Sequence, residues 1–127
     1  MNNKKFWIFI SAVSGFTAVA IGAFGTHGLK EKLTPEMLEV YKTGVLYHLI
    51  HTVVLLAISL SDKIKTQLPS IFFLLGIILF SFSLYIYSTS GIRFFAMITP
   101  FGGFSFLIGW LMIIVSLRKG LKDGSLN

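Results

Sequence analysis

Cysteine is absent from the 127 residues of this sequence, and charged residues are scarce. Without cysteine, the chain can form no disulfide, no thiolate metal site and no cysteine nucleophile. Charged residues make up 13% of the sequence, whereas an ordinary soluble domain carries about 25%. About half of the usual solvating charge is therefore missing, which argues against a soluble fold.

Apolar residues fill the place of the missing charges, at 54% of the sequence. The few charges stand in short clusters separated by long uncharged stretches, a pattern that a bilayer favours because its core offers no water to a charge. The net charge of +6 could indicate nucleic acid, but the Lys and Arg residues flank apolar segments, as membrane-topology signals do. We therefore expect the lipid bilayer as the partner, and no nucleic acid.

Four apolar segments are long enough to cross a membrane as helices, at approximately residues 6–25, 45–61, 69–88 and 94–117. The first follows Lys4 and Lys5, but it is longer than the apolar region of a signal peptide, so we interpret it as a retained helix. Pro100 removes one backbone donor from the fourth segment and is expected to bend or restart that helix. The sequence predicts an all-α integral membrane protein, with residues 1–127 forming one four-helix transmembrane domain.

A polar stretch between the first two spans carries its own helix signal. Thr34, Pro35 and Glu36 form an N-cap, a proline at the first helical position and an acid at the positive end of the helix dipole. Apolar residues then recur at helical spacing, with charged residues on the other face. We expect residues 35–44 to form a short amphipathic helix at the membrane interface.

The basic residues also predict the orientation. An even number of spans puts both termini on one side, together with seven basic residues: Lys4, Lys5, Lys63, Lys65, Arg118, Lys119 and Lys122. The opposite side holds four: Lys30, Lys32, Lys42 and Arg93. The excess predicts a multi-pass protein of the plasma or inner membrane with both termini in the cytoplasm.

Small residues indicate how the spans pack, because helices in lipid approach closely only where side chains are small. The expected packing positions are Gly15, Ala18, Gly22 and Gly25 in the first span and Gly102, Gly103 and Gly109 in the fourth. The third span is rich in aromatic residues, and we expect its rings to cover these two grooves. An unused stripe on the first span would suit a homo-oligomer or another membrane protein.

The polar residues of the spans are expected to gather in the outer half of the bundle. This candidate functional cluster consists of His27, Tyr47, His51, Tyr85, Arg93 and Thr99. It is open to three interpretations. The residues could form a structural seam of hydrogen bonds, or a site for a small molecule, lipid or protons. They could also supply a metal or haem site through His27, His48 and His51, although no carboxylate at membrane depth would complete that set.

Enzyme chemistry finds little support. Ser81 and Ser83 lie one helix away from the histidines, and no carboxylate is placed to orient a histidine. A phosphate-binding loop is also missing, since Gly102 and Gly103 lack the accompanying Lys and Ser or Thr. We therefore assign no catalytic, cofactor-binding or metal-binding residues. We expect a non-enzymatic structural, assembly or envelope-related component, or alternatively an oligomeric carrier or channel for a small solute, lipid or protons.

Four segments carry a family resemblance: GAFGTHGL at 22–29, YHLIH at 47–51, LFSFSLY at 79–85 and ITPFGG at 98–103. They resemble motifs of the uncharacterised family of small bacterial membrane proteins that contains YwdK and YgdD and has a eukaryotic transmembrane relative. The resemblance implies a four-helix inner-membrane protein without an established activity. His48 stands where the family pattern has Gln, which weakens the three-histidine metal site, and Phe82 stands where Gly is usual.

Overall fold

Helices account for every regular element of the computed structural model, which describes residues 1–124. The elements are α1 (Asn3–Gly28), α2 (Pro35–Leu60), α3 (Gln67–Gly76), the π-helical segment η1 (Ile77–Phe82), α4 (Ser83–Ser90) and α5 (Arg93–Lys122). Because α3, η1 and α4 continue into one another, they form a single span. Within residues 1–124, four helices are long and apolar enough to cross a membrane, which confirms the predicted all-α, four-span architecture.

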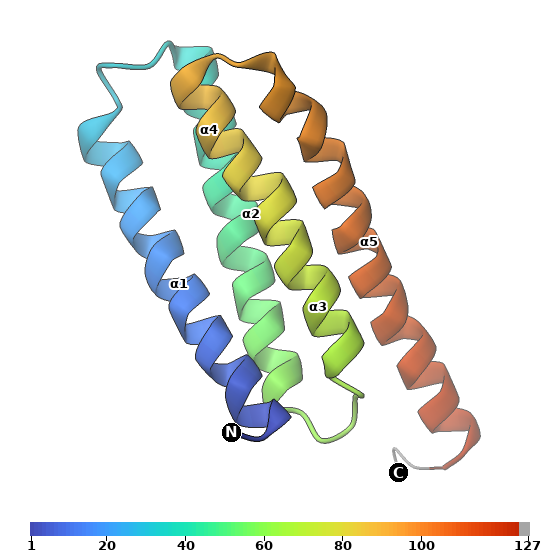
Figure 1. Cartoon of the computed structure of the whole chain (residues 1–127). Helices are drawn as coiled ribbons and strands as arrows, with labels where there is room; N and C mark the ends of the chain where they lie inside the picture. The colour runs from blue at the N-terminus through green and yellow to red at the C-terminus, as the bar shows by residue number, and fades with distance from the viewer. Residues whose placement is uncertain (125–127) are drawn as a thin grey trace.

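The four spans run alongside one another, with their connections at the two ends of the bundle (Figure 1). The main partner of α1 is α2, and the main partner of α5 is α3. The α2 helix and the span made of α3, η1 and α4 therefore occupy the middle, with α1 and α5 on opposite sides (Figure 1). Most contacts of α1 are therefore with α2, although at the terminus end Asn3 of α1 donates directly to Gln67 of α3 at 3.0 Å.

The α2 helix is longer than the sequence predicted, because residues 35–44 are its first turns. The cap itself is as expected: the Thr34 hydroxyl accepts a hydrogen bond from the Met37 N–H at 3.2 Å, and Pro35 begins the helix. The helix predicted over residues 35–44, feeding into the second span, is therefore the start of α2, and its Tyr41 turns inward and donates its hydroxyl to the Ile21 carbonyl of α1. The segment is thus packed against protein and continues into the span in one register.

Pro100 does not restart the fourth span, since α5 is helical without interruption from Arg93 to Lys122. A proline removes one backbone donor, and in membrane helices nearby hydroxyl groups can compensate for the freed carbonyls. Here the carbonyl that loses its N–H donor is that of Ala96, four residues before Pro100, whereas the Thr99 hydroxyl donates to the neighbouring Phe95 carbonyl at 3.3 Å and so does not replace the lost bond. Of the two outcomes that the sequence predicted at Pro100, a bend or a restart, the continuous helix excludes the restart.

The π-helical segment η1 was not predicted from the sequence. A wide turn of this kind adds one residue to the helix and rotates everything after it by about 100°. Phe73 and Tyr85 are twelve positions apart, so a regular helix would place them about 120° from each other. One extra residue reduces that to about 20°, and both side chains are in fact buried against α2. The π turn lets a single span present both residues to the same neighbour.

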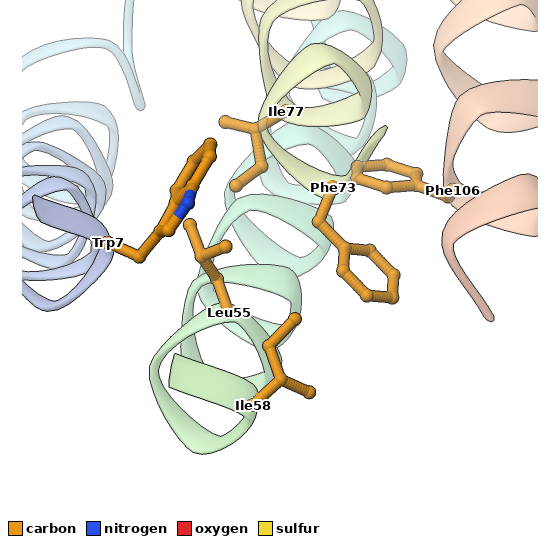
Figure 2. Close-up of a cluster of buried hydrophobic side chains, with 6 residues drawn as sticks. All are labelled: Trp7, Leu55, Ile58, Phe73, Ile77 and Phe106. Carbon is orange, nitrogen blue, oxygen red and sulfur yellow. The ribbon is translucent and has the colours of Figure 1, made fainter. Parts of the chain in front are cut away.

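An apolar cluster fills the end of the bundle nearer the termini. Its buried members are Trp7, Leu55, Ile58, Phe73, Ile77 and Phe106, which come from all four spans (Figure 2). Within lipid, such a cluster stabilises the fold through close packing, because the lipid tails are as apolar as the side chains. A second cluster, of Leu29, Tyr41 and Tyr85, lies toward the other end.

The small residues of α1 face α2. Ala18 is fully buried, Gly25 lies against the ring of Tyr41, and a Cβ at Gly22 would lie 3.1 Å from Val45. Gly15 is less crowded, with Thr52 at 3.6 Å. The expectation that this stripe is unused, or is covered by aromatic rings of the third span, does not hold, because α2 follows α1 after a short connection and covers it.

The glycines of α5 face the third span. A Cβ at Gly109 would lie about 3 Å from the ring of Phe73, at 2.9 Å from its nearest atom. A Cβ at Gly102 would overlap the backbone of Leu79 and Phe80 in η1, whereas one at Gly103 would find only Phe80 Cδ2, at 3.9 Å. Gly102 therefore allows α5 to approach the π turn directly.

We expect Gly102→Ala to destabilise the protein by about 1–3 kcal/mol, because the new methyl group would meet backbone that cannot move aside. The matched variant Gly103→Ala should be neutral or stabilising by up to about 1 kcal/mol, since alanine favours helix and space is available. Thermal unfolding of the two purified variants in detergent compares them. Equal loss of stability in both would contradict the direct approach of α5 to η1.

Candidate functional site

A hydrogen-bonded chain of four buried side chains crosses the bundle at its middle. We call it the His48 network; it consists of Ser14 from α1, His48 and Thr52 from α2 and Tyr85 from α4. His48 Nε2 lies 3.1 Å from Ser14 Oγ, and His48 Nδ1 lies 2.9 Å from the Tyr85 hydroxyl. Ser14 Oγ lies 2.6 Å from Thr52 Oγ1. Three spans are thereby joined through a single imidazole.

The helices position these groups by simple spacing. His48 and Thr52 are four residues apart, so both project from one face of α2. Ser14 lies on the α1 face that also carries the fully buried Ala18. The imidazole of His48 is almost completely buried, at 1% exposure, and a buried polar group of this size costs free energy unless it is paired. Both of its nitrogens are paired here.

The protons of the His48 network can be arranged in two ways. Tyr85 can donate to His48, His48 to Ser14 and Ser14 to Thr52, or each of these bonds can run in the opposite direction. Both terminal residues are buried, at 8% exposure for Tyr85 and 6% for Thr52. The network is therefore enclosed by protein at both ends.

His51 forms a second connection, between α2 and α5. Its Nδ1 lies 2.8 Å from the Tyr47 carbonyl oxygen, which can only accept, and its Nε2 lies 3.2 Å from the indole N–H of Trp110, which can only donate. These partners require the neutral imidazole with its proton on Nδ1. The ring also stacks on Phe106 with centroids 3.6 Å apart. A second proton on His51 would break the contact with Trp110.

Hydroxyl groups join α5 to the third span at two further points. Ser83 Oγ and Thr99 Oγ1 lie 2.7 Å apart, and Ser105 donates to the Phe72 carbonyl at 2.6 Å. Thr99 is thus part of a separate pair and not of the His48 network. The buried hydroxyls of Ser70 and Ser81 have no hydrogen-bond partner among residues 1–124.

A groove opens beside His51, between α2 and α5. It has a volume of about 450 Å³ and is lined by Tyr47, His51, Phe80, Pro100, Gly103, Phe104, Phe106, Leu107 and Trp110. The lining is mostly aromatic, and the ring of Tyr47 packs on Phe80 with centroids 4.4 Å apart. Its polar groups are few, which is usual for sites that hold small apolar molecules.

The structure divides the six residues of the predicted cluster. Tyr85 belongs to the His48 network, Tyr47 and His51 border the groove, and Thr99 pairs with Ser83. His27 and Arg93 are exposed at the end of the bundle and join neither group. Both stand at helix ends, His27 in the last turn of α1 and Arg93 at the start of α5, so their side chains extend past the packed part of the bundle.

The two buried histidines lie deeper in their helix than the sequence predicted. Because α2 begins at Pro35, His48 and His51 lie near its midpoint and not in its first turns. Ser14 likewise lies near the midpoint of α1. His48 and His51 are therefore central, whereas His27, Tyr85, Arg93 and Thr99 belong to the half of the bundle away from the termini.

The three-histidine arrangement is not formed. In residues 1–124, no three His, Asp or Glu side chains come close enough together to hold a metal ion. His48 and His51 direct their nitrogens toward different partners, and His27 is exposed. The donor set of His27, His48 and His51 thus does not fit a metal or haem.

Sequence reasoning missed three residues of the His48 network and of the His51 connection: Ser14, Thr52 and Trp110. A signal existed for the first two. Ser14 is three residues after Ser11 and four before Ala18 on the small-residue stripe, and Thr52 follows His48 by one helical turn. For Trp110 no local signal exists, because its partner His51 is 59 residues away and the pairing depends on how α5 is rotated.

The chain is similar to small membrane proteins from several bacteria. The family described as "Protein of unknown function (DUF423)" matches residues 21–103. The UPF0382 membrane protein YwdK of Bacillus subtilis is 42% identical over 123 residues, covering 92% of this chain and 99% of YwdK. The UPF0382 inner membrane protein YgdD of Escherichia coli is 36% identical over 127 residues, covering 94% of this chain and 97% of YgdD.

A UPF0382 membrane protein of Staphylococcus saprophyticus is 37% identical over 118 residues, covering 91% of this chain and 98% of its own length. No solved structure matches the chain. These likenesses confirm the family resemblance that the four sequence segments indicated.

We expect His48→Ala to destabilise the protein by about 2–5 kcal/mol, because it opens a cavity and leaves Ser14 and Tyr85 without their partner. His48→Gln should lose less stability, since an amide side chain can still donate and accept hydrogen bonds. The matched variant His27→Ala should change stability by less than about 0.5 kcal/mol, because that side chain is exposed. Thermal unfolding in detergent checks all three, and unchanged stability of His48→Ala would refute the structural role of the network.

Proposed function

Because the chain belongs to the UPF0382 family of membrane proteins, we propose that it is a non-enzymatic structural, assembly or envelope-related component of the cell membrane. In this proposal its buried polar residues fix the helices relative to one another and carry out no reaction. The names of its relatives identify membrane proteins and mention no reaction.

One observation carries the proposal: all four ring nitrogens of the two buried histidines are occupied by partners within the protein. His48 is engaged by Ser14 and Tyr85, and His51 by the Tyr47 carbonyl and Trp110. A catalytic base or a metal ligand needs a nitrogen that can reach a substrate or ion. Here such a nitrogen would become available only if a contact between helices were broken.

The acidic residues support the same proposal. Glu31 lies in the connection between α1 and α2, Glu36 and Glu39 in the first turns of α2, and Asp62 and Asp123 at the opposite end of the bundle. None lies beside His48 or His51. A histidine that takes up a proton during catalysis is commonly oriented and stabilised by a carboxylate, and this support is missing within residues 1–124.

The outer surfaces of α1 and α5 expose large apolar side chains, as expected for a structural component of the membrane. One face of α1 exposes Phe9, Phe16 and Phe24, and one face of α5 exposes Phe101 and Phe104. These side chains would contact lipid or the helix of another membrane protein.

The proposed orientation places both termini in the cytoplasm, supported by the excess of basic residues at that end of the bundle. The natural absence of cysteine makes this easy to test. In intact cells, a membrane-impermeant maleimide should label Glu31→Cys, in the connection between α1 and α2, and should not label Lys122→Cys at the end of α5. The reverse pattern would invert the proposed orientation.

A second candidate function is a carrier or channel for a small solute, lipid or protons, built as an oligomer. The groove beside His51 favours it, because its volume of about 450 Å³ is within the range of small-molecule sites. Filling this groove should interfere with such a function. Gly103 borders the groove, and a Cβ there would make only an ordinary contact with Phe80 Cδ2 at 3.9 Å, so Gly103→Leu adds bulk at the groove.

Flux measurements in liposomes distinguish the two candidates. We expect vesicles containing the purified protein to pass protons and glycerol no faster than protein-free vesicles, because a structural component needs no conducting path. If the wild-type protein passes a solute and both His51→Gln and Gly103→Leu abolish that flux, the structural proposal is rejected and the carrier is supported. Metal analysis of the same preparation should give far less than one transition metal per chain.

A further inference from the structure

A second groove lies at the terminus end of the bundle, between the start of α3 and the last turns of α5. It has a volume of about 620 Å³ and is lined by Lys65, Gln67, Leu68, Pro69, Ile108, Leu111, Met112, Val115, Ser116 and Lys119. A smaller cavity adjoins it and shares Lys65, Val115, Ser116 and Lys119 while adding Lys63. We call the two together the basic groove. It is distinct from the groove beside His51, with which it shares no lining residue.

The mouth of the basic groove is positively charged. Its three ammonium groups, those of Lys63, Lys65 and Lys119, make no hydrogen bond or ion pair with other residues of the described chain. One acid, Asp123, lies at the edge. The other acid at this end, Asp62, is bound by Lys4 at 2.8 Å, and that ammonium group holds the pKa of the carboxyl below its usual value. Among the described residues, a net positive charge therefore remains at the mouth of the basic groove.

The floor of the basic groove is apolar and follows α5 into the membrane. Ile108, Leu111, Met112 and Val115 line it on one side, and Leu68 and Pro69 on the other. From Ile108 to Lys119 the helix rises about 16 Å at 1.5 Å per residue. This length is close to half of the roughly 30 Å hydrocarbon core of a bilayer. The groove is thus about one leaflet deep, with its charges at the headgroup level.

We propose that the basic groove binds an anionic phospholipid, with the phosphate between Lys65 and Lys119 and an acyl chain along α5 from Val115 to Ile108. A free phosphate would satisfy the lysines but leave the apolar floor empty. A neutral apolar molecule would fill the floor but leave the lysines unpaired. An anionic phospholipid matches both parts, and basic pockets between membrane helices are known to hold such headgroups. The site depends on membrane insertion alone and not on the structural or carrier function proposed above.

The test uses the full-length protein purified in detergent and phosphatidylglycerol as the probe. Native mass spectrometry counts the bound lipid, and thermal unfolding measures the stabilisation that it causes. Phosphatidylglycerol should bind and raise the unfolding temperature, while phosphatidylcholine and glycerol 3-phosphate should do neither at the same concentration. The double variant Lys65→Gln/Lys119→Gln should bind phosphatidylglycerol about 30-fold more weakly, given the usual attraction of two surface lysines to anionic lipid.

A matched double variant, Lys5→Gln/Lys122→Gln, removes the same charge from the same end of the bundle outside the basic groove, and it should bind as the wild type does. For the apolar floor, Val115→Phe should weaken binding, whereas Val19→Phe on the exposed face of α1 should not. Equal weakening by both lysine variants would show general surface attraction and overturn the proposal. So would binding of phosphatidylcholine as tight as that of phosphatidylglycerol, or displacement of the lipid by glycerol 3-phosphate, which would indicate a site for a soluble anion.

Discussion

A buried imidazole in a bilayer must have partners, and the arrangement of this bundle depends on how His48 finds them. The ring is almost fully enclosed, and water cannot replace a lost hydrogen bond at that depth. Ser14 on one side and Tyr85 on the other satisfy it, so α1, α2 and α4 must keep one rotation and one depth relative to each other. His51 extends the same constraint to α5 through Trp110. Packing alone would leave these rotations less well defined, because apolar surfaces in lipid have many similar ways to fit.

The π turn makes these contacts compatible within one span. It brings Tyr85 to the face of the third span that already carries Phe73, so one face serves both His48 and His51. Gly102 of α5 lies directly against the same turn, at the backbone of Phe80. A wide turn, a glycine on the neighbouring helix and a buried tyrosine therefore form one connected feature. The position of each of the three is explained only together with the other two.

Polar chemistry is divided between two depths of the molecule. The central layer holds histidines and hydroxyls that are almost all satisfied within the protein, which suits rigidity better than reaction. The ends hold the charges, and at the terminus end three lysines remain without a partner in the described chain beside a deep apolar groove. Interaction with molecules outside the chain is therefore better supported at the membrane surface than at the centre. For a chain whose family is described only as membrane proteins of unknown function, this division favours lipid as the molecule that it binds.

The sequence by itself determined the class of protein, the number of spans and the cap at Thr34, because hydrophobic length and local capping depend on neighbours within a few residues. It could also nominate the small residues of α1 and α5 as packing positions. Only the tertiary structure decided that residues 35–44 belong to α2, that a π turn interrupts the third span, and that His48 meets Ser14 while His51 meets Trp110. These outcomes depend on the rotation and depth of whole helices, which are set by contacts between residues far apart in the chain. A periodic apolar pattern shows that a helix crosses the membrane, but every rotation of that helix exposes apolar side chains to lipid, so the pattern cannot select which face turns inward.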